Sequence, residues 1–127
     1  MERFLWVCAA GALGSGARYL VALWAGKALG AGFPYGTLIV NVLGCFSMAA
    51  VMQAAMGTTW ISPALRVALT TGFLGGLTTY SAFNFETLKL FEERAYRLGV
   101  LNFGLTTGGC IAASLLGMLL AKRLTGS

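Results

Sequence analysis

The residues of this sequence that are best suited to chemistry gather in one apolar stretch. The run from Gly72 to Ser81 contains a glycine pair followed by hydroxyl side chains, at Gly75, Gly76, Thr78, Thr79 and Ser81. Glycine and back-bonding threonine both weaken a helix, so we expect the helix to break here. A kinked but continuous helix, stabilised by the threonine hydroxyls, is the alternative.

A broken helix offers chemistry that a continuous helix lacks. Its first half would end in free carbonyl groups, which suit a cation, and its second half would begin with free N–H groups, which favour an anion. Within a membrane, such a break is tolerated only where protein or a cavity satisfies the freed backbone. One break could therefore serve ions of both signs.

An aromatic pair follows the glycines and threonines. Tyr80 and Phe83 lie three residues apart on one helical face, with Ser81 and Asn84 beside them. Aromatic residues at this spacing commonly belong to a packed core. A ring also has a positive edge, so an anion can lie against it without a formal countercharge. Both interpretations stay open.

Polar side chains also follow the other apolar stretches. Thr37 and Asn41 lie four residues apart on one helical face. An asparagine at membrane depth must bond across a helix interface or face water, and the sequence leaves these two roles equal. A further stripe comprises Asn102, Thr106, Cys110 and Ser114. It can bind helices together, or replace the water shell of a small anion without a fixed charge that traps it.

We expect two charged residues, Arg18 and Glu86, to be drawn into the helix bundle. Arg18 could line an aqueous vestibule and attract anions, or it could extend its side chain to the membrane surface. Glu86 is expected to pair with a cation or to cap a neighbouring helix.

Four elements must position these residues. With 57% hydrophobic and 10% charged residues, the chain carries far less charge than the roughly 25% of soluble domains. Apolar stretches over 4–29, 34–56, 63–91 and 95–120 are each long enough to cross a bilayer. The sequence therefore predicts one all-α membrane domain, 1–127, with four transmembrane helices of which the third is broken.

Several function classes are excluded or disfavoured. The chain contains no histidine, so imidazole relays, catalytic triads and the usual zinc sites are absent. It has no paired acidic residues within an apolar stretch, and we expect no enzyme activity. The net charge of +5 is not organised into a basic patch interleaved with aromatics, so we expect no nucleic-acid partner. The three cysteines, Cys8, Cys45 and Cys110, are interpreted as small packing residues.

The lysines and arginines show almost no preference for one side of a four-helix bundle. Four fall on one side, namely Arg3, Arg66, Lys122 and Arg123. Five fall on the other side, namely Arg18, Lys27, Lys89, Arg94 and Arg97. Such balance permits insertion in both orientations, and hence an antiparallel dimer with a twofold axis in the membrane plane. Small residues four apart favour close helix contacts, at Ala10 and Gly14, Gly72 and Gly76, and Gly104 and Gly108.

Four segments of the sequence resemble the Fluc fluoride channels, also called the CrcB family. They are Gly11–Tyr19, Gly36–Gly44, Gly72–Phe83 followed by Glu86, and the polar stripe from Asn102 to Gly117. The resemblance covers nearly the whole chain, and the third segment is its most specific part. It implies an antiparallel homodimer with two pores, each lined by both subunits, which exports fluoride passively across the bacterial inner membrane.

The resemblance also implies roles for individual residues. A structural Na+ on the dimer axis would be held by main-chain carbonyls of Gly75 and Thr78. Fluoride would pass along a set of uncharged side chains, namely Thr37, Asn41, Tyr80, Ser81, Phe83, Asn102, Thr106 and Ser114.

Three positions depart from the family pattern. Tyr80 stands where phenylalanine is usual, Ala82 where threonine is usual, and Cys110 where a small residue such as glycine or serine is more familiar. A phenol at position 80 could add a hydrogen bond to fluoride or narrow its path.

Two alternatives remain. A small multidrug transporter would need a carboxylate deep in the first helix, whereas Glu2 precedes that helix and Glu86 lies in the third. A scaffold protein that transports nothing would account for the glycines, but not for the hydroxyl and aromatic residues concentrated at one break.

Overall fold

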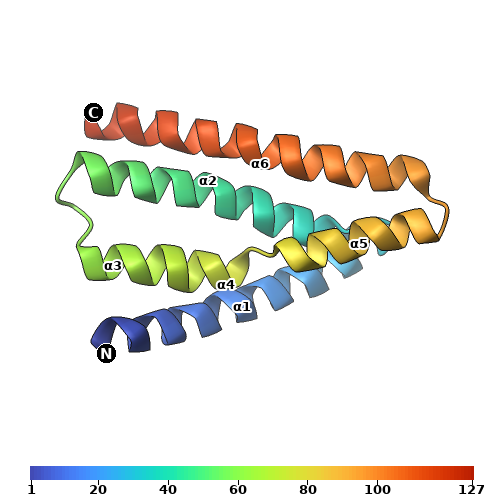
Figure 1. Cartoon of the computed structure of the whole chain (residues 1–127), viewed down its shortest axis with the longest axis horizontal. Coiled ribbons are helices and arrows are strands. Elements are labelled where there is room, and N and C mark those ends of the chain that lie inside the picture. Colours follow the sequence, from blue (N-terminus) through green and yellow to red (C-terminus); the bar gives the residue numbers. More distant parts are fainter.

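The computed structural model describes residues 1–127, and every element in it is helical (Figure 1). Three long helices are α1 (Glu2–Ala28), α2 (Tyr35–Gly57) and α6 (Tyr96–Thr125). Each is long and apolar enough to cross a membrane. The predicted stretches 4–29 and 34–56 agree with α1 and α2 within two residues, whereas α6 continues past the predicted end at 120. The prediction of an all-α chain is confirmed.

The predicted third helix is indeed interrupted. It starts as α3 (Pro63–Val67), widens into the π-helix η1 (Ala68–Leu74) and ends as the short α4 (Gly75–Leu77). Two extended residues, Thr78 and Thr79, then separate it from α5 (Tyr80–Glu92). The alternative of a kinked but continuous helix is therefore wrong.

The chain breaks at the threonines and not at the glycines before them. Gly75 keeps helical dihedral angles, with φ −62° and ψ −37°. Thr79 is extended, and its hydroxyl accepts a hydrogen bond from the Ala82 N–H at 3.2 Å, which caps the start of α5. The threonine side chain thus offers the backbone an alternative to the helical bond.

Small residues bring the helices together, at one predicted position and at one that was not predicted. A Cβ added at Gly14 would overlap the carbonyl of Phe73, so α1 lies directly against the interrupted helix. A Cβ at Gly117 would overlap the carbonyl of Phe46, so α6 lies equally close to α2. Gly104 and Gly108 differ, because nothing within this chain lies within 4 Å of a Cβ added at either position.

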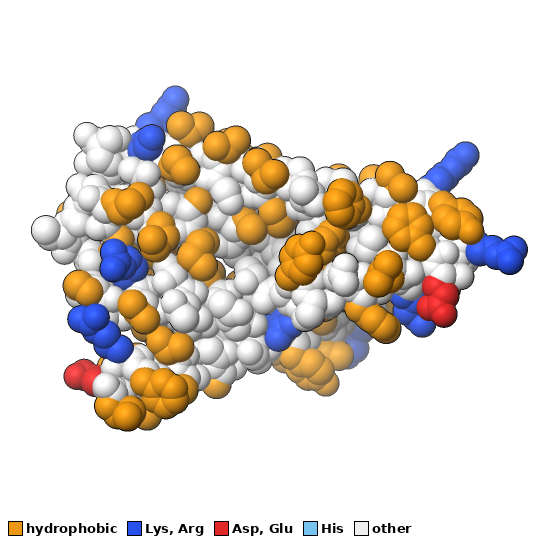
Figure 2. Space-filling model, in the orientation of Figure 1, with side chains coloured by type: hydrophobic (Ala, Val, Ile, Leu, Met, Phe, Trp, Pro, Cys, Tyr) orange, Lys and Arg blue, Asp and Glu red, His pale blue; other side chains and the backbone are white.

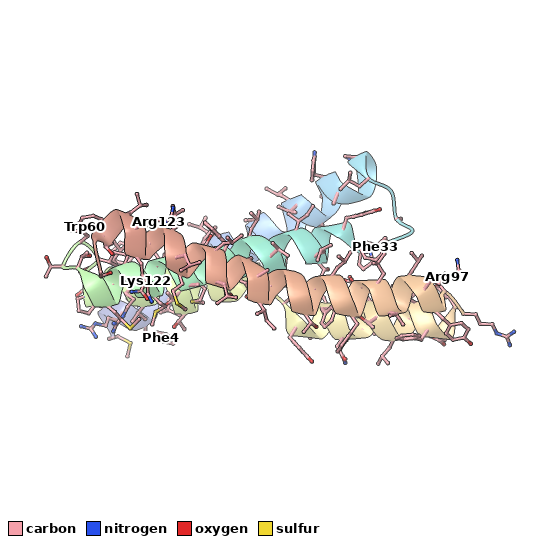
Figure 3. The ribbon with its side chains drawn as sticks, turned by 90° about the horizontal axis from the view of Figure 1, so that it is seen from above. Phe4, Phe33, Trp60, Arg97, Lys122 and Arg123 are labelled. Carbon is pink, nitrogen blue, oxygen red and sulfur yellow. The ribbon has the colours of Figure 1, made fainter.

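The outer surface is that of a protein in lipid. Only 19 of 127 residues are buried, and most large apolar side chains lie on the outside. Hydrophobic side chains are spread over the face in Figure 2 among uncharged surface, and most lysine and arginine side chains lie toward its two ends. Lys122 and Arg123 lie at one end and Arg97 at the other (Figure 3). The two chain termini share one end (Figure 1).

Candidate functional site

Asn41 holds the interruption in the third helix. Its Nδ2 donates to the carbonyl of Thr79 at 2.9 Å, and its Oδ1 accepts from the N–H of the same residue at 2.8 Å. The side chain is only 7% exposed. One amide thus replaces both backbone partners of Thr79 in a region where unpaired groups are costly. Of the two roles that the sequence left equal, an interhelical bond is the one this protomer shows.

The interruption removes the helical hydrogen-bond donors of two carbonyl groups, those of Gly75 and Thr78. In a continuous helix the Thr79 N–H would donate to the Gly75 carbonyl, but here it donates to Asn41. Likewise the Ala82 N–H, the helical partner of the Thr78 carbonyl, donates to the Thr79 hydroxyl. Gly75 is exposed on the protomer surface and Thr78 is half-buried. Freed carbonyl oxygens are suitable ligands for a hard cation, so these residues fit a sodium ion.

Aromatic side chains form a row beside the interruption. Tyr80 meets Phe83 in an edge-on arrangement, with ring centroids 5.7 Å apart. Phe83 stacks in turn on Phe103 of α6, with centroids 6.3 Å apart. Phe83 is 4% exposed, whereas Tyr80 is 77% exposed. The predicted pair is thus an internal ring and a ring that projects from the protomer, and Phe103 was not foreseen because it belongs to another helix.

Small polar side chains accompany Tyr80 on the protomer surface. Ser81 and Asn84 are both exposed. The Ser81 hydroxyl lies 3.3 Å from that of Thr79. Ser81 and Tyr80 follow the cap directly, so the free N–H groups of the first turn of α5 are near them. No charged residue belongs to this group.

The polar stripe of α6 does not form one continuous line. Asn102 is 1% exposed and donates to Thr87 at 2.9 Å, and Thr87 donates to the Phe83 carbonyl. Thr106 is 6% exposed, and its buried hydroxyl has no partner within the chain. Ser114 donates to the Cys45 carbonyl of α2 at 3.3 Å. Asn102 and Ser114 therefore join helices, and Thr106 alone keeps a free hydroxyl.

Thr37 lies one helical turn before Asn41 but faces a different partner. Its hydroxyl donates to Glu86 Oε1 at 2.8 Å, and the other carboxylate oxygen is buried without a partner. Both residues line a cavity of about 390 Å³ beside the loop that joins α1 to α2. We expected a cation or a helix cap for Glu86; its partner is a hydroxyl in the first turn of α2. Arg18 is half-buried on α1 and forms no ion pair.

Together the fold and this site define a class of protein. Long apolar helices surround a discontinuous helix whose freed backbone groups meet uncharged side chains, as in multi-pass membrane proteins that handle ions. A family model described as "CrcB-like protein, Camphor Resistance (CrcB)" matches residues 5–118. The chain belongs to this family.

Individual relatives cover almost the full length. A protein of Sorangium cellulosum named "Fluoride-specific ion channel FluC" is 46% identical over 124 residues, covering 98% of both chains. A protein of Anaeromyxobacter dehalogenans with the same name is 47% identical over 126 residues, covering 99% of this chain and all of its own. A third, from Geobacter metallireducens, is 46% identical over 114 residues, covering 90% and 92%.

Proposed function

We propose that this chain is one protomer of a fluoride-specific ion channel. The observation that carries the proposal is the interruption held by Asn41, which places hydroxyls, an amide and ring edges together without a formal charge. Neutral donors can replace the water around a small anion and still release it. Relatives that share 38–47% of its residues over nearly its full length are named as such channels.

The interrupted helix makes the fourth membrane crossing in this proposal. The shared end of the two termini supports an even number of crossings (Figure 1). The segment from Pro63 to Glu92 is 30 residues long, which is enough to span the bilayer even with two extended residues inside. The channel then lies in the bacterial inner membrane as a multi-pass protein surrounded by lipid.

A second copy in the opposite orientation completes the site. Tyr80, Ser81, Asn84 and Gly75 are exposed on one protomer close to the interruption, and polar groups facing lipid at this depth are costly. A twofold axis through the interruption buries these groups against their equivalents. The carbonyls of Gly75 and Thr78 from both copies would then hold one structural Na+, which would bind the copies together and would not conduct.

Fluoride passes between the two copies in this proposal. Arg18 draws it into a vestibule, and Asn41, Ser81 and the edges of the rings of Tyr80 and Phe83 replace its water. The unpartnered hydroxyl of Thr106 supports a place on the path. Thr37, Asn102 and Ser114 complete the path, and each first has to share or release the hydrogen bond that it makes within the protomer.

Fluoride efflux from liposomes that contain the purified protein tests the proposal, with chloride-loaded liposomes beside them. We expect fluoride flux and little chloride flux. Phe83→Ile and Asn41→Asp should each abolish fluoride flux while the dimer persists in gel filtration. Phe85→Ile is the matched control, because Phe85 is 66% exposed and has no ring partner. A protein without fluoride flux would favour the scaffold alternative, and unchanged flux in both variants would refute the assigned path.

A further inference from the structure

Two thiols that the proposed channel does not use lie together between α2 and α6. Ser114 donates to the Cys45 carbonyl, and Cys110 lies one helical turn before Ser114, so it faces Cys45 across the contact. The two side chains are therefore close enough to influence each other. Both cysteines are free and half-buried, whereas Cys8 is exposed on α1.

The backbone around the thiols leaves little freedom to separate them. Gly117 brings α6 against the carbonyl of Phe46, the residue after Cys45. Gly109, the residue before Cys110, lies against Val42, with 3.5 Å between its added Cβ and the valine methyl. The pair is therefore preorganised, which favours a ligand that both sulfur atoms can bind at once.

The surroundings decide which ion such a pair can hold. No group of three or more histidine, cysteine or acidic residues is available, so the tetrahedral site that zinc prefers cannot form. Thiolates select soft ions. A monovalent soft ion bound by two thiolates would leave one net negative charge in the membrane, which is costly. A divalent ion that accepts two ligands in a line gives a neutral complex.

We propose that Cys45 and Cys110 form a two-coordinate site for mercuric ion. Two thiols and one Hg2+ yield a neutral S–Hg–S bridge and release two protons to water, so charge and atoms balance without any oxidant. The bridge joins α2 to α6. Its attachment in α6, Cys110, is four residues from both Thr106 and Ser114. Resting on the proposed function, we further infer that bridging stops fluoride flux, because it locks the contact at which Ser114 has to release its hydrogen bond to the Cys45 carbonyl.

Binding is tested first, without reference to transport. The whole protein carrying Cys8→Ser is titrated with HgCl2 against a competing monothiol, and bound metal is read by intact-mass spectrometry. We expect one mercury per chain with the loss of two protons. Cys45→Ser and Cys110→Ser, each left with one thiol, should bind about 100-fold more weakly because the second contact is lost.

Alanine variants at both positions guard against an effect of the serine hydroxyl, and gel filtration reports whether each variant is folded. Equal affinity in the two-thiol protein and in the one-thiol variants would overturn the site. Binding of two mercury ions per chain would overturn it as well, because each thiol would then act alone.

Flux is measured second, in the same Cys8→Ser protein. The blocking step is supported if HgCl2 stops fluoride efflux and a dithiol chelator restores it. In both one-thiol variants HgCl2 should leave efflux unchanged. Tight chelation with unchanged efflux would leave the metal site standing and overturn the block. A protein that chelates mercury but never conducts fluoride would contradict the proposed function alone.

Discussion

Two helix contacts made by α2 solve the same packing problem differently. Between α2 and α6, glycines such as Gly117 let two unbroken helices approach, and every backbone bond stays inside its own helix. Between α2 and the interrupted helix, backbone bonds are given up and Asn41 replaces them. Glycine alone therefore permits close approach, whereas opening a helix in the membrane also needs a polar side chain from a neighbour.

Among the substitutions that test this comparison, Asn41→Leu should have the largest effect on stability. Both backbone groups of Thr79 would be left unpaired, and each buried unpaired group costs roughly 1–3 kcal/mol. We expect a marked fall in the thermal unfolding temperature of the purified protein in detergent. Gln53→Leu is the matched control, since Gln53 is an amide on the same helix and its loss leaves no backbone group unpaired. Equal unfolding temperatures in the two variants would contradict the role of Asn41.

Substitutions at the α2–α6 contact should destabilise the protein through steric overlap and not through lost hydrogen bonds. Gly117→Ala places a methyl group onto the Phe46 carbonyl, and overpacking of this kind costs about 1–3 kcal/mol. Gly104→Ala adds the same methyl group where nothing in the chain lies within 4 Å. Chemical denaturation of the two variants should therefore differ clearly. If Gly104→Ala destabilised the protomer equally, the loss would have to come from something other than close packing.

The cap on α5 should have a smaller effect. Thr79→Val keeps the shape of the side chain but removes the hydroxyl that accepts from Ala82, and a lost cap costs about 1 kcal/mol. Hydrogen exchange at the first turn of α5 should accelerate, because that N–H loses its partner. Thr79→Ser retains the hydroxyl and should exchange at close to the native rate. Slow exchange in both variants would mean that the cap contributes little.

Tyr80→Phe should scarcely affect the stability of the protomer. Tyr80 is 77% exposed, and surface substitutions of this kind usually change stability by less than about 0.5 kcal/mol. If the phenol donates to fluoride between the two copies, the efflux rate should change while the unfolding temperature does not. An unchanged rate would place the hydroxyl away from the fluoride path. A large change in unfolding temperature would instead give Tyr80 a structural role.

Much of the fold was predictable because lipid imposes simple rules. The lengths of the apolar stretches located α1, α2 and α6 within a few residues, except at the C-terminal end of α6. The run of glycines and threonines predicted the interruption, since both residue types weaken a helix locally. The small-residue contacts at Gly14 and Gly72 were likewise predictable from spacing.

Partners across the fold were not predictable in the same way. The sequence singled out Asn41 and left its role open, because its partner Thr79 lies 38 residues away. Phe103 joined the aromatic row, and Thr87 became the partner of Asn102, only through the packing of α6 on α5. Cys45 and Cys110, interpreted separately as packing residues, became a pair in the same way.

The sequence by itself determined which segments cross the membrane and where a helix must fail, since both follow from local composition and the solvent. Only the tertiary structure decided how that failure is stabilised. Hydrogen bonds act over about 3 Å, so a chain must first bring distant residues together before one can replace the backbone partner of another. In this protein a single amide from α2 does so and leaves the carbonyl of Gly75 without its helical donor, while the Thr79 hydroxyl has the same effect on the carbonyl of Thr78.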